Sequence, residues 1–152
     1  MTGLIFPILC FIFLSHSRYW EAIGKWDESL TLFPNDEKTL EMKAQALSTL
    51  NELYPAVNVA EQAVNAKPTW WVSQQTLGRC QLNIGEIKSA IVTFQKAIHL
   101  QPDCEELWVE DLQWARDLLK DLQTKHKHLT QEELSFHVRE CMRIGINQAN
   151  AS

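Results

Sequence analysis

The chain has 152 residues, of which 45% are hydrophobic and 22% charged, so its composition is that of a folded protein rather than a disordered or collagen-like one. Its 14 basic residues are outnumbered by 19 acidic ones, and the net charge of −5 argues against a nucleic-acid-binding surface. The length suits one ordinary domain. The four cysteines are scattered without a C-x-x-C pair, which favours reduced thiols in the cytoplasm or nucleus over a disulfide framework or a zinc site.

The first feature along the chain is an uncharged apolar run, LIFPILCFIFL, from Leu4 to Leu14. It is too short to span a bilayer, which takes about 20 residues. Ser15-His16-Ser17 resembles a signal-peptide cleavage pattern, but Met1-Thr2-Gly3 lacks the positive charge of a signal peptide. We expect Pro7 to break a regular helix through the run. Three interpretations stay open for residues 1–17: a targeting segment, a buried first helix, or an atypical start.

A 34-residue period runs through the middle of the chain. Pro34, Pro68 and Pro102 are spaced by 34 residues, and an alanine precedes each of them by twelve positions. The columns that align at this period are Ala22, Ala56 and Ala90, then Trp26, Ala60 and Phe94, then Ser29, Ala63 and Ala97. Small residues at fixed positions let two helices approach closely, and each proline follows a helix that it cannot continue. The repeating unit is therefore predicted to be two antiparallel helices joined by a short turn.

This pattern resembles the tetratricopeptide repeat, whose motif W-x₂-L-G-x₂-Y…A-x₃-F…P has the same period. The third unit matches best, because it carries Leu77-Gly78 in its first helix and Ala90-x₃-Phe94 in its second. Gln74 and Gln81 replace two aromatic residues of the motif. The first unit keeps only its second half, because the apolar run occupies its first-helix positions. The resemblance implies an all-α solenoid of about three helix pairs and a C-terminal capping helix.

The periodicity and the capping signals divide the chain into three parts. We predict helices at 20–33, 37–51, 55–67, 71–83, 86–100, 104–123 and about 131–144. Residues 1–17 form the apolar segment, which is signal-like or stands in for the first repeat helix. Residues 18–123 form the repeat domain with its capping helix, and residues 124–152 form a polar linker and a short C-terminal helix.

No sequence motif assigns catalysis. The P-loop, H-E-x-x-H, G-x-S-x-G and G-x-G-x-x-G patterns are absent, so we predict no enzyme, no cofactor and no metal. His137 and Cys141 share one helix face, but two ligands are too few for a metal site. Asp111 is expected to be a solvated carboxylate on the capping helix. The tryptophans expected to pack in the core are Trp26, Trp108 and Trp114.

The repeat register predicts a groove lined by the first helix of each unit. Its residues are Lys38, Glu41, Gln45, Val72, Gln75, Arg79, Glu106, Val109, Gln113 and Arg116. This mixture of amides, charges and two valines suits a peptide held by hydrogen bonds, although a merely solvated surface is an equal alternative. By analogy with the family, we predict a non-enzymatic adaptor that binds a protein segment of unknown identity. The alternative is a membrane-tethered or lumenal repeat protein targeted by its apolar N-terminus.

Many tetratricopeptide-repeat proteins bind the acidic C-terminal tails of heat-shock chaperones through a clamp of Lys, Asn and Arg side chains. The clamp positions of the family correspond here to Pro7, Phe11, Met42, Val72 and Thr76. None of these residues supplies the cation or the amide that would pair a carboxylate. We therefore predict no specific binding of an acidic chaperone tail.

Overall fold

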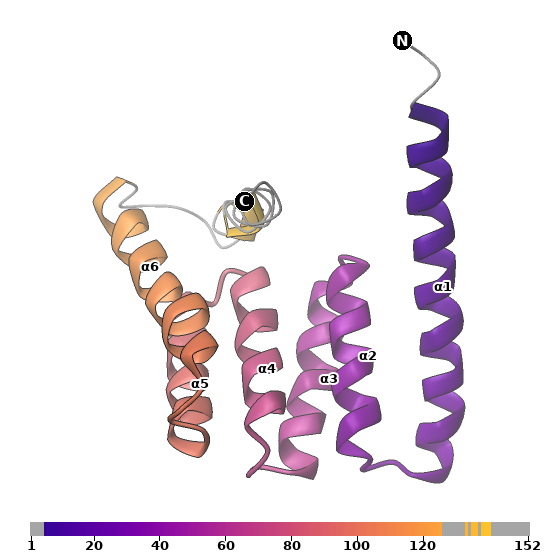
Figure 1. Ribbon diagram of the computed structural model, residues 1–152, viewed down its shortest axis with the longest axis horizontal. Coiled ribbons are helices and arrows are strands. Elements are labelled where there is room, and N and C mark those ends of the chain that lie inside the picture. The colour runs from indigo at the N-terminus through magenta and orange to yellow at the C-terminus, as the bar shows by residue number, and fades with distance from the viewer. Residues whose placement is uncertain (1–4, 126–132, 134, 137, 141–152) are drawn as a thin grey trace.

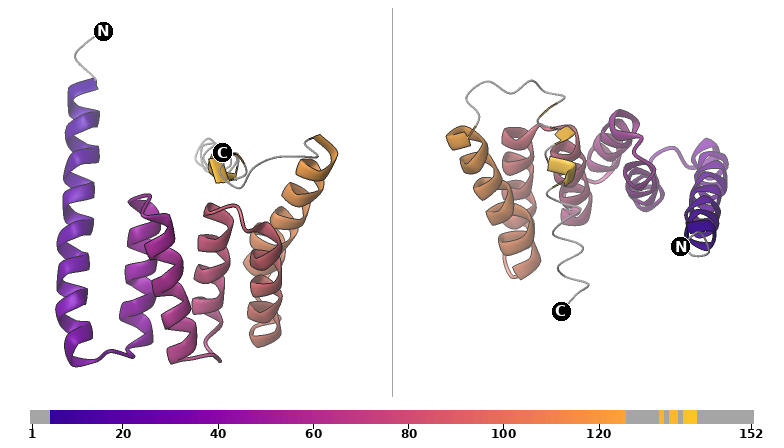
Figure 2. Two further views of the ribbon diagram at one scale, coloured as in Figure 1. Left: turned by 180° about the vertical axis from the view of Figure 1, so that it is seen from behind. Right: turned by 90° about the horizontal axis from the view of Figure 1, so that it is seen from above.

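The computed structural model describes residues 5–125, 133, 135–136 and 138–140, and of residues 5–14 it describes the backbone. Every regular element in these ranges is helical. The helices are α1 (Ile5–Leu32), α2 (Glu37–Thr49), α3 (Leu53–Ala66), α4 (Trp71–Asn83), α5 (Ile87–Leu100), the π-helix η1 (Leu107–Gln113) and α6 (Trp114–Lys125). They stand side by side in chain order, with α1 at one edge and α5 and α6 at the other (Figures 1 and 2). The predicted all-α solenoid is confirmed.

The pairs α2/α3 and α4/α5 are the two complete repeat units. Each pair is joined by a turn containing one residue with positive φ, Asn51 at 65° and Gly85 at 83°. These two residues occupy the same place in the 34-residue period. Glycine adopts this conformation without steric cost, and asparagine tolerates it better than most residues do. The predicted helix-turn-helix unit is therefore correct for both pairs.

Small residues bring the two helices of a unit together. Ala56 and Ala63 on α3, and Ala90 and Ala97 on α5, are at most 1% exposed. In the third unit the contact is so close that a Cβ atom on Gly78 would lie 2.4 Å from Cε1 of Phe94. Only glycine therefore fits beneath that ring.

Two apolar clusters form the core. One joins α1 to α2, α3 and α4, and the other joins α4 and α5 to η1 and α6. Val138, in the predicted C-terminal helix, is fully buried in the second cluster. The described residues between 133 and 140 are helical, as expected, while the rest of that segment lies outside the described residues.

The helix α1 differs from the expectation. It is continuous from Ile5 to Leu32, whereas the sequence predicted a helix from residue 20 and a break at Pro7. Pro7 lies in the first turn of α1, where its missing N–H removes no intrahelical hydrogen bond. The N-terminal part of α1 extends past the ends of α2 and α3 instead of turning back to form a helix pair (Figure 1). Within the described residues, no helix combines the length and the apolar character needed to cross a bilayer.

The capping region also departs from a regular helix. Residues Leu107–Gln113 have π-helical winding, and α6 continues to Lys125, two residues beyond the expected end. Trp108 is 47% exposed and donates from Nε1 to the carbonyl oxygen of Pro102 at 2.8 Å, so its predicted core position was wrong. Trp26 and Trp114 are half-buried against the two clusters.

Candidate functional site

The residues predicted to line the groove lie on α2 and α4, the first helices of successive units, and on the cap formed by Glu106, η1 and α6. Side-chain hydrogen bonds join α2 directly to α4. Thr76 Oγ1 donates to Glu41 Oε1 at 2.6 Å, and Asn83 Nδ2 donates to Ser48 Oγ at 2.7 Å. Both pairs are 35 residues apart, one more than the period, so the repeat itself creates these contacts. Gln45 Nε2 also donates to Glu41 Oε1.

A denser group of polar side chains joins α4 to η1. Arg79 Nε donates to Asp111 Oδ1 at 2.7 Å, and Arg79 Nη2 donates to Asp111 Oδ2 at 3.2 Å and to Glu106 Oε1 at 2.5 Å. Gln75 Nε2 donates to Asp111 Oδ2 at 2.7 Å and to Glu106 Oε1 at 3.1 Å. Asp111 is only 4% exposed, so these donors replace the water that its carboxylate would otherwise bind. The expectation that Asp111 is solvated was wrong.

The charge of Arg79 is fixed by this arrangement. Burial opposes the charge, but the hydrogen bonds and charges of Asp111 and then of Glu106 outweigh it, so the pKa of Arg79 is raised above its ordinary value. Its planar fork engages Asp111 bidentately, which is the strong form of a charge-assisted hydrogen bond. Arg79 therefore ties α4 to η1, and its side chain remains 41% exposed.

Asp111 lies within the π-helical segment. Asp111 and Leu112 are adjacent, yet both are buried, one in the polar contacts with α4 and the other in the apolar cluster. Single π-helical turns within α-helices often occur at functional positions. Sequence reasoning missed this carboxylate. Its spacing of 32 residues from Arg79, close to the period, is the signal that could have found it.

The structure divides the predicted groove residues into two layers. Glu41 and Gln75 are buried, and Arg79 and Val72 are partly exposed, which makes them an inner layer. The exposed members, which we call the outer layer, are Lys38, Gln45, Glu106, Val109, Gln113 and Arg116. Met42 on α2 is also 43% exposed, and Val109 is 57% exposed. Among the described residues, no buried side-chain nitrogen or oxygen lacks a hydrogen-bond partner.

Cys80 lies beneath the α2–α4 contact and is 2% exposed. Burial, aided by the nearby charge of Glu41, raises the pKa of Cys80 to about 12, although a hydrogen bond with Ser48 acts in the opposite direction. Its thiol is therefore protonated at neutral pH and is a poor nucleophile. Cys80 is a packing residue of α4.

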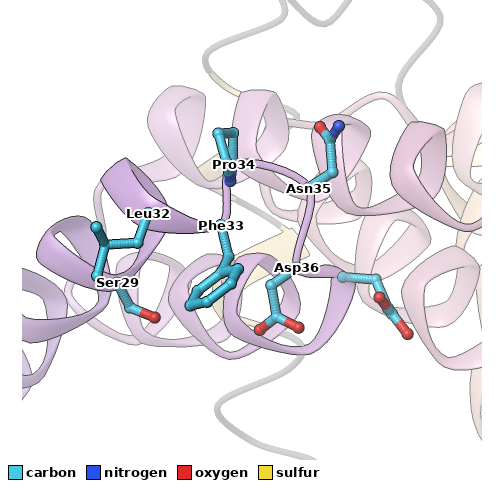
Figure 3. A pocket seen from close by; sticks show the side chains of 7 residues that line it. Ser29, Leu32, Phe33, Pro34, Asn35 and Asp36 are labelled. Carbon is cyan, nitrogen blue, oxygen red and sulfur yellow. The ribbon is translucent and has the colours of Figure 1, made fainter.

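Two pockets lie away from these residues, at the turn between α1 and α2. One, of about 550 Å³, is lined by Ser29, Leu32, Phe33 and the residues 34–37 (Figure 3). The other, of about 260 Å³, lies between residues 34–35 and the end of α3. Neither pocket contains a nucleophile paired with a base. Within the described part of the chain there is no group of three His, Cys, Asp or Glu residues that could hold a metal ion, and His137 and Cys141 lie outside it.

The chain is similar to curated proteins over most of its helical region. It is 55% identical to human tetratricopeptide repeat protein 33 over 103 residues, which is 68% of this chain and 39% of that protein. The chain therefore spans well under half the length of this relative. No protein-family model matches the chain.

Solved structures show the same fold. The first tetratricopeptide-repeat domain of RPAP3 (Spaghetti), bound to the HSP90 peptide SRMEEVD, superposes with a TM-score of 0.65 at 18% identity over 71% of this chain and 85% of that one. The TPR2B domain of yeast Sti1, in a complex with a pHsp70 peptide, gives a TM-score of 0.54 at 17% identity over 84% of this chain and 88% of that one. These likenesses show the tetratricopeptide-repeat fold, whose members typically bind other proteins without catalysis.

Proposed function

We propose that this chain, which has the tetratricopeptide-repeat fold and resembles tetratricopeptide repeat protein 33, is a non-enzymatic adaptor that binds a protein segment through its outer layer. The observation that carries the proposal is the separation of the two layers. The inner polar groups are satisfied by one another and by Gln45 and Glu106, while Lys38, Val109 and Arg116 stay exposed and take no part in those hydrogen bonds. A segment that binds through these exposed residues and Gln113 would leave the contacts between α2, α4 and η1 unbroken.

The outer layer favours an extended segment with mixed character. Gln45 and Gln113 lie on the first helix of the second unit and on the cap, and both are exposed. Met42 and Val109 are exposed apolar side chains that precede Gln45 and Gln113 by three and four residues on the same helices. Amide side chains can hydrogen-bond the backbone of an extended peptide, and exposed apolar side chains can contact the side chains of that peptide. The two solved neighbours that carry peptides support this kind of ligand.

The proposal can be tested by photo-crosslinking. A photoreactive amino acid is placed at Gln45 or Gln113 in the outer layer, or at the control Gln95, which is exposed on α5. The expected result is one protein that crosslinks from Gln45 and Gln113 and not from Gln95 when the full chain is expressed in cells. Equal crosslinking from all three positions would contradict a binding role for the outer layer.

A charge variant gives a second measurement. Arg116→Glu reverses a charge in the outer layer, while Lys96→Glu makes the same reversal on the exposed side of α5. The amount of protein that crosslinks from Gln45 and Gln113 should fall with Arg116→Glu and stay unchanged with Lys96→Glu. Arg79 is unsuitable for this purpose, because an acidic residue there would face Asp111 and Glu106 and disturb the fold.

A further inference from the structure

Two carboxylates are buried among the described residues, and they differ in what balances their charge. Asp111 is 4% exposed and Glu41 is 6% exposed. Asp111 forms an ion pair with Arg79, whose Nε lies 2.7 Å from Asp111 Oδ1. Glu41 takes part in none of the ion pairs that the described residues form with one another. Because burying a charge is costly unless an opposite charge accompanies it, Glu41 is the carboxylate that lacks its counter-charge.

The 34-residue period shows where a cation for Glu41 would stand. Gln45 lies 34 residues before Arg79 and therefore occupies the same place in its own unit. Its Nε2 donates to Glu41 Oε1, so the side chain at this place reaches the carboxylate, but it is neutral. The other donor to Glu41, Thr76 Oγ1, is neutral as well. The contact between α2 and α4 therefore has no positive charge at the place that Arg79 fills in the next unit.

One oxygen of the Glu41 carboxylate is open. Gln45 and Thr76 both donate to Oε1, whereas Oε2 accepts no hydrogen bond from the described residues. Every buried side-chain oxygen among these residues has a hydrogen-bond partner, so Oε2 must reach the surface, which here is the groove that α2 and α4 line. Gln45 is exposed and its bond to Glu41 lies within α2, so it can rotate away while Thr76 still joins the two helices.

We propose that the protein segment bound in this groove carries a lysine whose ammonium group pairs with Glu41 Oε2. This inference rests on the proposed function and adds the side chain that the groove selects. A lysine suits a single open oxygen because its ammonium is a compact charge on a thin stem, whereas the fork of an arginine is suited to both oxygens. Met42, next to Glu41, and Val72, one helical turn before Thr76, are exposed and partly exposed. They supply apolar surface for the methylene stem of the lysine.

The charges around Glu41 favour a cation over an anion. Lys38 lies one helical turn before Glu41 on α2, but it is exposed and its charge is screened by water and salt. Arg79 on α4 is held by Asp111 and Glu106, so these three side chains carry one net negative charge. The five side chains together are two basic and three acidic, so this part of the groove attracts an ammonium group and repels a carboxylate.

The test begins with a phage-displayed library of random dodecapeptides, selected against the full wild-type chain. A selected peptide is synthesised with blocked ends, and a second copy carries norleucine in place of its lysine, which keeps an aliphatic stem and removes the charge. Glu41→Gln keeps the shape of the side chain and an oxygen for Thr76. Glu61→Gln makes the same substitution on the exposed side of α3 and is the matched control. Fluorescence anisotropy gives the Kd of each combination.

We expect the selected peptides to share a lysine, and Glu41→Gln and norleucine each to weaken binding about tenfold or more. The two changes together should weaken binding little more than either one alone, because both remove the same contact. Glu61→Gln should leave the Kd unchanged. Losses that combine in full, or an equal loss with Glu61→Gln, would overturn the pair and leave only a general attraction of basic peptides. Selected peptides that share an arginine instead would overturn the choice of lysine.

Failure of this inference is distinguishable from failure of the proposed function. Peptides that share no basic residue, and whose binding still falls with Arg116→Glu, would overturn the lysine and leave the outer layer as the binding surface. A chain that selects no peptide at all would overturn both proposals.

Discussion

The first and third repeat units carry the same pattern of residues but differ in how deeply those residues are buried. Ala90, Phe94 and Ala97 on α5 are all fully buried. Their counterparts on α1 are partly exposed, because α1 packs against α2 on one side only. Burial in a repeat protein thus depends on a neighbouring helix as well as on the sequence of the column itself.

The two units also differ in their polar links. The contact between α4 and η1 buries the Asp111 carboxylate under donors from Arg79 and Gln75. The contact between α1 and α2 has an ion pair between Lys43 and Asp27, whose Asp27 side chain is 53% exposed. The third unit is therefore joined to its neighbour by apolar and polar contacts together, and the comparison can be tested separately for each.

The largest expected loss of stability follows from removing the large residue of the column that aligns Trp26 with Phe94. We expect this loss to be large in the third unit and smaller in the first. Phe94→Ala would leave a cavity beside Gly78 and is expected to lower the free energy of unfolding by about 3–5 kcal/mol. Trp26→Ala should cost less than half as much, because that ring is already partly in water. Urea denaturation measures both. Equal losses would show that the two columns are equally covered.

Removing the basic residue of each polar link should give a smaller difference. Arg79→Ala leaves the buried Asp111 carboxylate with Gln75 as its remaining donor, and we expect a loss of about 1–3 kcal/mol, reduced by the partial exposure of the arginine. Lys43→Ala removes a pair whose Asp27 partner is half exposed, and it should cost about 1 kcal/mol. Thermal unfolding of the two variants beside the wild type makes the comparison. A larger loss for Lys43→Ala would reverse the ranking.

The Cys80 thiol reports on how tightly the α2–α4 contact stays closed. Because its pKa is raised from 9.0 to about 12, its thiolate fraction near pH 8 is about a thousandfold below that of an ordinary cysteine. The shift stabilises the fold fully below pH 9, and this contribution is lost as the pH rises towards 12, since the unfolded thiol ionises first. We expect iodoacetamide to modify Cys80 in urea but hardly at all in the native chain. Rapid native labelling, located by mass spectrometry, would mean that α4 opens readily.

The sequence predicted the complete units well because each of their signals is local or periodic. The helix at Trp71–Asn83 has the predicted bounds, and the others of the two pairs differ by one or two residues at their ends. The continuous α1 was missed because the argument against it placed Pro7 inside a helix, whereas Pro7 lies in the first turn. Whether the following residues turn back depends on which surface is available to them, and the repeat pattern does not encode this.

The sequence predicted where the residues of the candidate site lie along the helices, but not how exposed their side chains are. The register placed Glu41 and Arg79 on the correct helices, yet it gave both the same status as Gln113, which is exposed. Their burial arises from contacts about one period away in the chain, with Thr76 for Glu41 and with Asp111 for Arg79. Asp111 lies in η1, and the sequence gives no local signal for the π-helical winding of that segment.

The smallest expected effect is the binding of an acidic chaperone tail. The first unit and the complete units both lack the groups to bind such a tail, for different reasons. The first unit would have to supply cations or amides from Pro7 and Phe11, which have none. In the complete units, Thr76 is 6% exposed and already donates to Glu41, whose carboxylate would repel a second carboxylate at that place. Pairing an acidic tail here would therefore bury charge without a partner.

Calorimetry with the peptide SRMEEVD, which occupies the solved RPAP3 domain, gives the measurement, and that domain is the positive control. We expect binding heat from the RPAP3 domain and none from this chain. The prediction follows because none of the five clamp positions holds a cation. Micromolar binding that disappears when the C-terminal carboxylate of the peptide is amidated would contradict it. Such a result would also show that the repeat register is wrong, because that register assigns Met42, Val72 and Thr76 to the clamp positions.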